Sequence, residues 1–159
     1  MTLLTRKVDY ALLILSYLHE RPEGASAREI AAGFDGLSRA FAANILKELC
    51  QRGVVASHRG VKGGYLLLRP AEEISLLELM EALDDTVHLA ECNKSSAKSD
   101  DCLFLNVCPV KGPMSIVHQR VRAALENVKL AELFRPAAQP RTGQFGLELV
   151  PGEPQLAVR

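Results

Sequence analysis

The sequence of 159 residues predicts a mainly α-helical fold with a small β-hairpin wing, a winged helix-turn-helix followed by a long dimerisation helix. Three observations lead to this prediction. Apolar residues recur at helical spacing near the N-terminus, two short helices follow with a glycine-containing turn between them, and a basic glycine-rich segment separates two strand-like runs. A hydrophobic content of 48% is typical of a folded chain and excludes wholesale disorder.

The first helix is expected over about residues 6–19. One apolar stripe follows the helical spacing of three or four residues and comprises Val8, Ala11, Leu12, Leu15 and Leu18. A second stripe has the same spacing and comprises Tyr10, Leu13, Ile14 and Tyr17. A helix that is apolar on two sides must be covered twice, either as a central core helix or by contact with a second subunit as well.

Two further helices form the helix-turn-helix pattern. Ser26 and Glu29 have the spacing of a capping box, which predicts a helix that begins here and ends near Gly33. Ser38 is the N-cap candidate of the next helix, which ends near Gly53. The inner face of this second helix comprises Phe41, Ala42, Ile45, Leu46 and Leu49. Two short helices joined by a tight glycine-containing turn are typical of a helix-turn-helix.

A β-hairpin is expected next. Two strand-like runs, residues 54–56 and 65–68, flank a segment that contains three glycines and the cations Arg59 and Lys62. Glycine permits the positive φ angles of a hairpin tip, so this segment is the predicted wing. A second capping box, with Ser75 as its N-cap, begins a further short helix.

No periodicity is sustained after this short helix until Pro113, which suits the first turn of a long helix. The apolar stripe of the long helix comprises Met114, Val117, Val121, Leu125 and Val128. A single amphipathic helix after a long loop needs a covering surface, so we expect this stripe to form a homodimer interface. The predicted division is a winged helix-turn-helix over residues 1–84, a cysteine-containing loop over 85–112, a dimerisation helix over 113–135 and an extended or disordered tail over 136–159.

Charge is unevenly distributed, although 19 Lys and Arg balance 19 Asp and Glu. Residues 1–70 hold ten basic and six acidic residues, residues 71–112 three and nine, and the remainder six and four. A basic part joined to an acidic part indicates either contact with a polyanion or solvated charged faces. The longest apolar run, residues 11–15, is too short to span a membrane and no signal-peptide layout is present, so we expect a cytoplasmic protein with reduced cysteines.

Three of the four cysteines, Cys92, Cys102 and Cys108, lie in the aperiodic loop with the spacing C-x9-C-x5-C, whereas Cys50 suits the core of the helix-turn-helix. The spacing is not that of a zinc finger. Clustered thiols in a reducing compartment indicate a soft-metal or iron–sulfur site, or a metal-free redox pair. Spacing leaves the fourth ligand open among His88, Glu91, Asp100, Asp101, His118 and Asp9.

Three motifs carry a family resemblance. The runs LTRKVDYA at 4–11, RGVKGGY at 59–65 and ISLLE at 74–78, followed by three cysteines, resemble the Rrf-two family of bacterial iron–sulfur winged-helix regulators, which includes proteins similar to IscR, NsrR and RirA. The resemblance covers about residues 3–135. It implies a dimeric DNA-binding transcription factor in which three cysteines of each subunit hold an iron–sulfur cluster.

The resemblance also bears on the fourth ligand. In IscR-like members a histidine lies three residues after the last cysteine, and here that position is Lys111, whose ammonium cannot serve as a ligand. In NsrR-like members an aspartate of the first helix, donated by the other subunit, completes a 4Fe–4S site, and the matching residue is Asp9. The resemblance therefore favours a 4Fe–4S cluster with Asp9 in trans over a 2Fe–2S cluster.

Such a regulator reads double-stranded DNA with the N-terminal part of its second helix-turn-helix helix in the major groove. Arg39 suits guanine and Asn44 suits adenine, while cations of the wing suit a minor groove or phosphates. The full set of expected DNA contacts is Ser38, Arg39, Phe41, Asn44, Lys47, Arg59 and Lys62. Two-fold symmetry predicts a pseudo-palindromic operator.

No catalytic motif stands out, so we expect neither an enzyme nor a small-molecule substrate or membrane partner. The predicted function is a dimeric, cluster-sensing transcriptional repressor that responds to redox state, nitric oxide or iron. Two alternatives are a metal-free, thiol-based DNA-binding regulator and an iron–sulfur electron-transfer protein.

Overall fold

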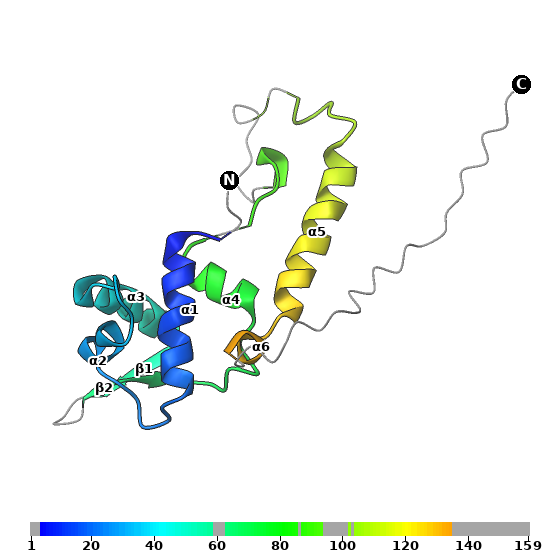
Figure 1. Cartoon of the computed structure of the whole chain (residues 1–159). Helices are drawn as coiled ribbons and strands as arrows, with labels where there is room; N and C mark the ends of the chain where they lie inside the picture. Colours follow the sequence, from blue (N-terminus) through cyan, green and yellow to red (C-terminus); the bar gives the residue numbers. More distant parts are fainter. Residues whose placement is uncertain (1–3, 59–62, 86, 94–101, 103, 135–159) are drawn as a thin grey trace, which may run out of the picture.

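A computed structural model describes residues 4–58, 63–85, 87–93, 102 and 104–134. Their elements are α1 (Arg6–His19), α2 (Ala27–Ala32), α3 (Arg39–Gln51), β1 (Val55–His58), β2 (Gly64–Leu67), α4 (Leu76–Ala82), the 3-10 helix η1 (Glu91–Asn93), α5 (Lys111–Asn127) and α6 (Leu130–Phe134). Helix α1 lies between the helix-turn-helix with its hairpin on one side and α4 and α5 on the other (Figure 1). This order confirms the predicted mainly helical, winged architecture, whereas the predicted tail, residues 136–159, lies outside the described residues.

The short helices begin where local side-chain chemistry predicts. The Ser26 side chain accepts a hydrogen bond from the Glu29 amide while the Glu29 carboxylate accepts one from the Ser26 amide, so the capping box is complete. The Glu29 carboxylate also accepts from the Ser26 hydroxyl at 2.7 Å, and the bonds from the Ser26 amide and hydroxyl hold the pKa of Glu29 below its ordinary value. Ser38 caps α3 by accepting from the Phe41 amide at 3.2 Å, as predicted.

The second predicted capping box forms only in part. Ser75 Oγ accepts from the Glu78 amide at 3.1 Å, but the Glu78 carboxylate pairs with the Arg69 guanidinium. The backbone at this helix start is instead tied to the end of the long helix, because the Leu76 amide donates to the carbonyl of Val128. A distant segment thus satisfies one of the free amides at this helix start.

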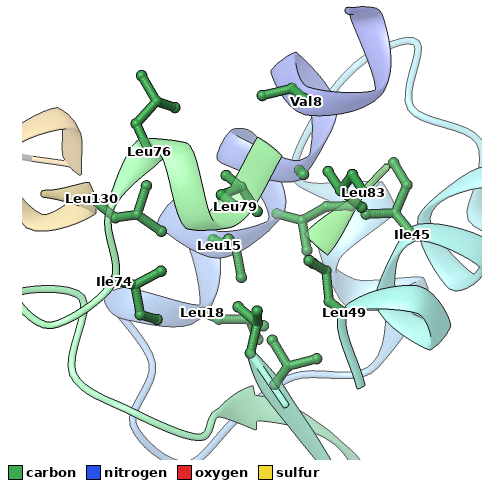
Figure 2. Packing of buried hydrophobic residues seen from close by; sticks show 14 of the residues in the cluster. Val8, Leu15, Leu18, Ile45, Leu49, Ile74, Leu76, Leu79, Leu83 and Leu130 are labelled. Atoms are coloured by element: carbon green, nitrogen blue, oxygen red, sulfur yellow. The ribbon is translucent and has the colours of Figure 1, made fainter. Parts of the chain in front are cut away.

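Apolar residues from α1, α3, α4 and α6 form one core (Figure 2). All five members of the first α1 stripe are buried or half-buried as predicted, and Ile14 of the second stripe joins them at 0% exposure. Leu13 remains 40% exposed on the opposite side. The members of the core that are labelled in Figure 2 are Val8, Leu15, Leu18, Ile45, Leu49, Ile74, Leu76, Leu79, Leu83 and Leu130.

The wing is anchored at its root. Strands β1 and β2 pair antiparallel, and Ala25 and Tyr65 exchange two backbone hydrogen bonds of 2.8 and 2.9 Å that join the hairpin to the loop before α2. A side chain at Gly64 has no room, since a Cβ there would lie 2.7 Å from the Ala25 carbonyl oxygen. The close approach fixes the root of the wing relative to the helix-turn-helix.

Helix α5 begins at Lys111, two residues before the predicted start at Pro113. Proline fits the first helical turn, where the amide has no intrahelical partner, so it does not mark the first residue. Val128 has left the helix and is extended, and Leu125 is packed into the core of its own chain at 9% exposure. In the part of the chain that the structure describes, no helix is both long and apolar enough to cross a bilayer.

Candidate nucleic-acid interface and cysteine site

The N-terminal half of α3 presents a polar surface. The predicted contact residues Ser38, Arg39, Phe41, Asn44 and Lys47 are all exposed. The opposite side of the helix is buried through Ala42, Ile45, Leu46 and Leu49. Burial on one side holds the helix in place and leaves the other free to face a ligand such as a DNA groove.

Phe41 lies at the boundary between the exposed and the buried side of α3. It is 37% exposed, and its ring packs edge-to-face on Tyr10 of α1, with ring centroids 5.3 Å apart and planes at 86°. The sequence pattern places Phe41 both among the inner residues of α3 and among the expected DNA contacts, and its half-packed position is compatible with both. The wing cations Arg59 and Lys62 lie outside the described residues.

The segment at the start of the cysteine loop is joined to α3 and to the N-terminus of α1. Lys7 Nζ lies 2.5 Å from Glu48 Oε2 on α3 and donates to the Leu83 carbonyl at 3.3 Å. Arg52, at the end of α3, pairs with Asp84 at 2.7 Å. Sequence analysis missed this set of contacts, because the partners are separated by 32 to 76 residues and have no shared spacing signal.

Asp84 itself has an unusual backbone. Its φ of +57° lies in the left-handed region, which a non-glycine residue adopts only at a cost. Next to it, the Asp85 carboxylate accepts from the Thr5 amide at 3.1 Å. The chain therefore turns sharply into the cysteine loop at a point held by α1 and α3.

The three loop cysteines are free and half-exposed. Cys92 lies in η1, Cys102 in the loop and Cys108 two residues before the N-cap of α5, and Asp9 is exposed in the first turn of α1. Their donor chemistry fits an iron–sulfur cluster, since reduced and accessible thiols are its usual ligands. Within the described ranges, however, no three Cys, His, Asp or Glu side chains gather closely enough to hold a metal.

Two other candidate ligands come together where sequence analysis saw no link. The rings of His88 and His118 lie 6.1 Å apart between centroids, with planes at 17°. Burial, the nearby Arg122 cation and His88 lower the pKa of His118. The acidic candidates Asp100 and Asp101 lie outside the described residues, as does the side chain of Glu91.

Cys50 differs from the loop cysteines. It is half-buried and packs against the core, as expected from its place on the inner half of α3. Burial raises the pKa of its thiol, and a hydrogen bond with Ser57 offsets part of that rise. Cys50 is therefore a structural thiol and a matched control for the other three.

Comparison with known proteins identifies the family. A family model described as Rrf2, iron-dependent transcriptional regulator, matches residues 4–136. An rrf2-like HTH-type transcriptional regulator of Rhodobacter capsulatus is 30% identical over 147 residues, which cover 86% of this chain and 97% of that protein.

Solved structures share the fold. IscR of T. potens is similar, with a TM-score of 0.62 and 23% identity over 89% of this chain and 92% of that one. The oxidized form of Staphylococcus aureus CymR is similar, with a TM-score of 0.61 and 25% identity over 87% of this chain and all of that one. The exposed helix-turn-helix surface, the anchored hairpin and the family match agree, and the chain belongs to the Rrf2 family of DNA-binding transcription regulators, which are not enzymes.

Proposed function

We propose that this regulator is a homodimer whose affinity for its operator depends on an iron–sulfur cluster held by the cysteine loop, and that it acts as a repressor. The observation that supports this proposal is the set of contacts that join the start of the loop to the recognition helix α3. Lys7 and Arg52 link that segment to α3, so a change in the loop can alter how α3 is held. The coupling required is modest, about 1–3 kcal/mol.

The recognition helix would enter the major groove of double-stranded DNA through its exposed N-terminal half. Arg39 would bond guanine and Asn44 adenine, with Ser38, Phe41 and Lys47 beside them. Arg59 and Lys62 at the wing would contact the adjacent minor groove or phosphates. A dimer would recognise a pseudo-palindromic operator with half-sites about 34–36 Å apart.

The cluster would be held by Cys92, Cys102 and Cys108, with Asp9 of the second subunit as the fourth ligand and 4Fe–4S as the favoured form. A bound cluster supplies a redox-active and chemically labile group, tuned by the charge and solvent exposure around it. The chain's own part is to deliver three half-exposed thiols from one loop and a carboxylate from the exposed first turn of α1. A 2Fe–2S cluster is the alternative form.

The dimer would use α5. Of the stripe Met114, Val117, Val121, Leu125 and Val128, the C-terminal members pack on the chain's own core, and Leu125 is already buried there. Toward the N-terminal end of the helix, Ile116 and Val117 are 54% and 46% exposed. We therefore expect the contact between subunits to be strongest at this end of α5, with Ile116 as a residue that the sequence stripe omitted.

Anaerobic purification of the full chain tests the cofactor. We expect a brown protein with iron and acid-labile sulfide, and loss of both in Cys92→Ser but not in Cys50→Ser, which removes the structural thiol. Zinc in place of iron, or equal iron in the two variants, would contradict the proposal.

A second candidate is a metal-free thiol regulator. It is favoured by the likeness to the oxidized form of Staphylococcus aureus CymR and by the separation of the donors among the described residues. In that case the anaerobic protein would be colourless and without metal. Its operator affinity would then change on oxidation of the loop cysteines.

A further inference from the structure

Polar atoms without partners collect where the cysteine loop meets α5. His88 of the loop and His118 of α5 lie side by side, and neither buried Nδ1 atom has a hydrogen-bond partner among the described residues. The buried Oδ1 of Asn93 is in the same situation, and it belongs to η1, which packs on α5. A buried polar atom without a partner costs about 1–3 kcal/mol. Such atoms along one seam indicate a ligand that pairs with them.

We infer that His88 and His118 bind one first-row transition-metal ion of the zinc type through their Nδ1 atoms, at a site separate from the cysteines. Neutral imidazole nitrogen is a preferred donor for zinc, nickel and copper. The two nitrogens belong to neighbouring rings whose centroids lie 6.1 Å apart. An offset aromatic pair would account for the ring positions but would leave both Nδ1 atoms unpaired.

Arg122 of α5 is a charged neighbour of this pair. The Arg122 cation opposes a metal ion, and its pairing with Glu81 Oε1 at 2.6 Å reduces that opposition. Two protein donors leave positions for water, so the site is weaker than a structural zinc site with four protein ligands.

A metal ion bound by both histidines would link the cysteine loop to α5. His88 lies four residues before Cys92, and α5 carries the exposed apolar surface of Ile116 and Val117. An ion between the histidines ties the N-terminal part of the loop to α5. It therefore restricts the motion of residues 87–93 whether or not the thiols hold a cluster.

Titration of the full chain with zinc chloride, followed by calorimetry, tests the inference. Cys92, Cys102 and Cys108 are replaced by serine, so thiols do not compete. We expect one ion per chain, and at least tenfold weaker binding after His88→Gln and after His118→Gln. His19→Gln is the matched control, since its ring packs on Phe134 of α6 and its loss leaves zinc binding unchanged.

Three results would overturn the inference: no zinc binding by the serine protein, zinc binding by both glutamine variants as tight as that by the serine protein, or weakened binding in only one of the two variants. Circular dichroism checks that each variant is folded. If the serine protein does not fold, the same comparison is made on the wild-type chain after its thiols have been alkylated. Because no DNA and no iron are present, failure here leaves the proposed regulatory function untouched.

Discussion

The contacts of a single residue in this chain can be predicted most reliably when its partners are near in sequence. Ser26, Glu29 and Ser38 cap helices as their spacing predicts, because each bond spans three residues. His88 and His118 pack together across thirty positions, and Lys7 reaches Leu83 across 76. Such contacts depend on how α1, α4 and α5 are arranged, and a linear pattern contains no information on that arrangement.

Replacement of Arg39 by alanine tests the recognition surface. Because the side chain is exposed on α3 and its guanidinium matches the edge of guanine, we expect a loss of about 1–3 kcal/mol in specific binding. Fluorescence anisotropy at one salt concentration measures the dissociation constants of the wild-type protein and of Arg39→Ala for an operator fragment that the wild-type protein has selected.

Arg120→Ala is the control for Arg39→Ala. It removes the same charge from an exposed position on α5, so the net charge of the protein changes equally while the surface of α3 is kept. An equal effect of the two replacements would remove Arg39 from base recognition.

Among the elements, helix types and order were predictable, but some of their ends were not. The capping and glycine signals located α2 and α3, whereas Pro113 lies inside the first turn of α5 and Val128 lies beyond its end. Val128 is extended because its carbonyl accepts from Leu76, a residue of another element. An element end that is fixed by tertiary hydrogen bonds has no local sequence signal.

The anchored wing root gives a prediction about an element. Gly64→Ala brings a Cβ to 2.7 Å from the Ala25 carbonyl oxygen, so the hairpin must move and the free energy of unfolding falls by about 1–3 kcal/mol. Urea denaturation measures the free energy of unfolding of Gly64→Ala and of the wild type. We expect the operator affinity of Gly64→Ala to fall as well, because the wing is displaced.

Gly112→Ala is the matched control for Gly64→Ala. A Cβ there meets nothing within 4 Å and lies in the first turn of α5, so stability should hold or rise slightly. If Gly64→Ala were as stable as the wild type, the root of the wing would not be fixed by this close approach.

In the whole molecule, the cysteine loop connects the part that is expected to bind DNA with the helix α5 that is expected to form the dimer. Its start is tied to the recognition helix through Lys7 and Arg52, and its end leads into α5. Sequence analysis located the loop and its cysteines but could not show these ties, because ion pairs between exposed side chains follow no period. A second subunit that packs on α5 would complete the surroundings of the loop.

A charge on α5 tests the predicted dimer. Val117→Glu places a carboxylate in the exposed apolar surface of that helix, and we expect dissociation to monomers in sedimentation velocity because a buried unpaired charge is costly. Leu133→Glu on α6 is the control, since Leu133 is 45% exposed and Val117 46%. A dimer that survives Val117→Glu would place the interface elsewhere.

The central claim is that the state of the cysteine loop sets the affinity for DNA. The most direct measurement compares operator dissociation constants of the full chain with its cluster and after cluster removal, anaerobically and at one salt concentration. The coupling proposed above corresponds to a change of about 5- to 150-fold. Equal dissociation constants for the two forms would contradict the account.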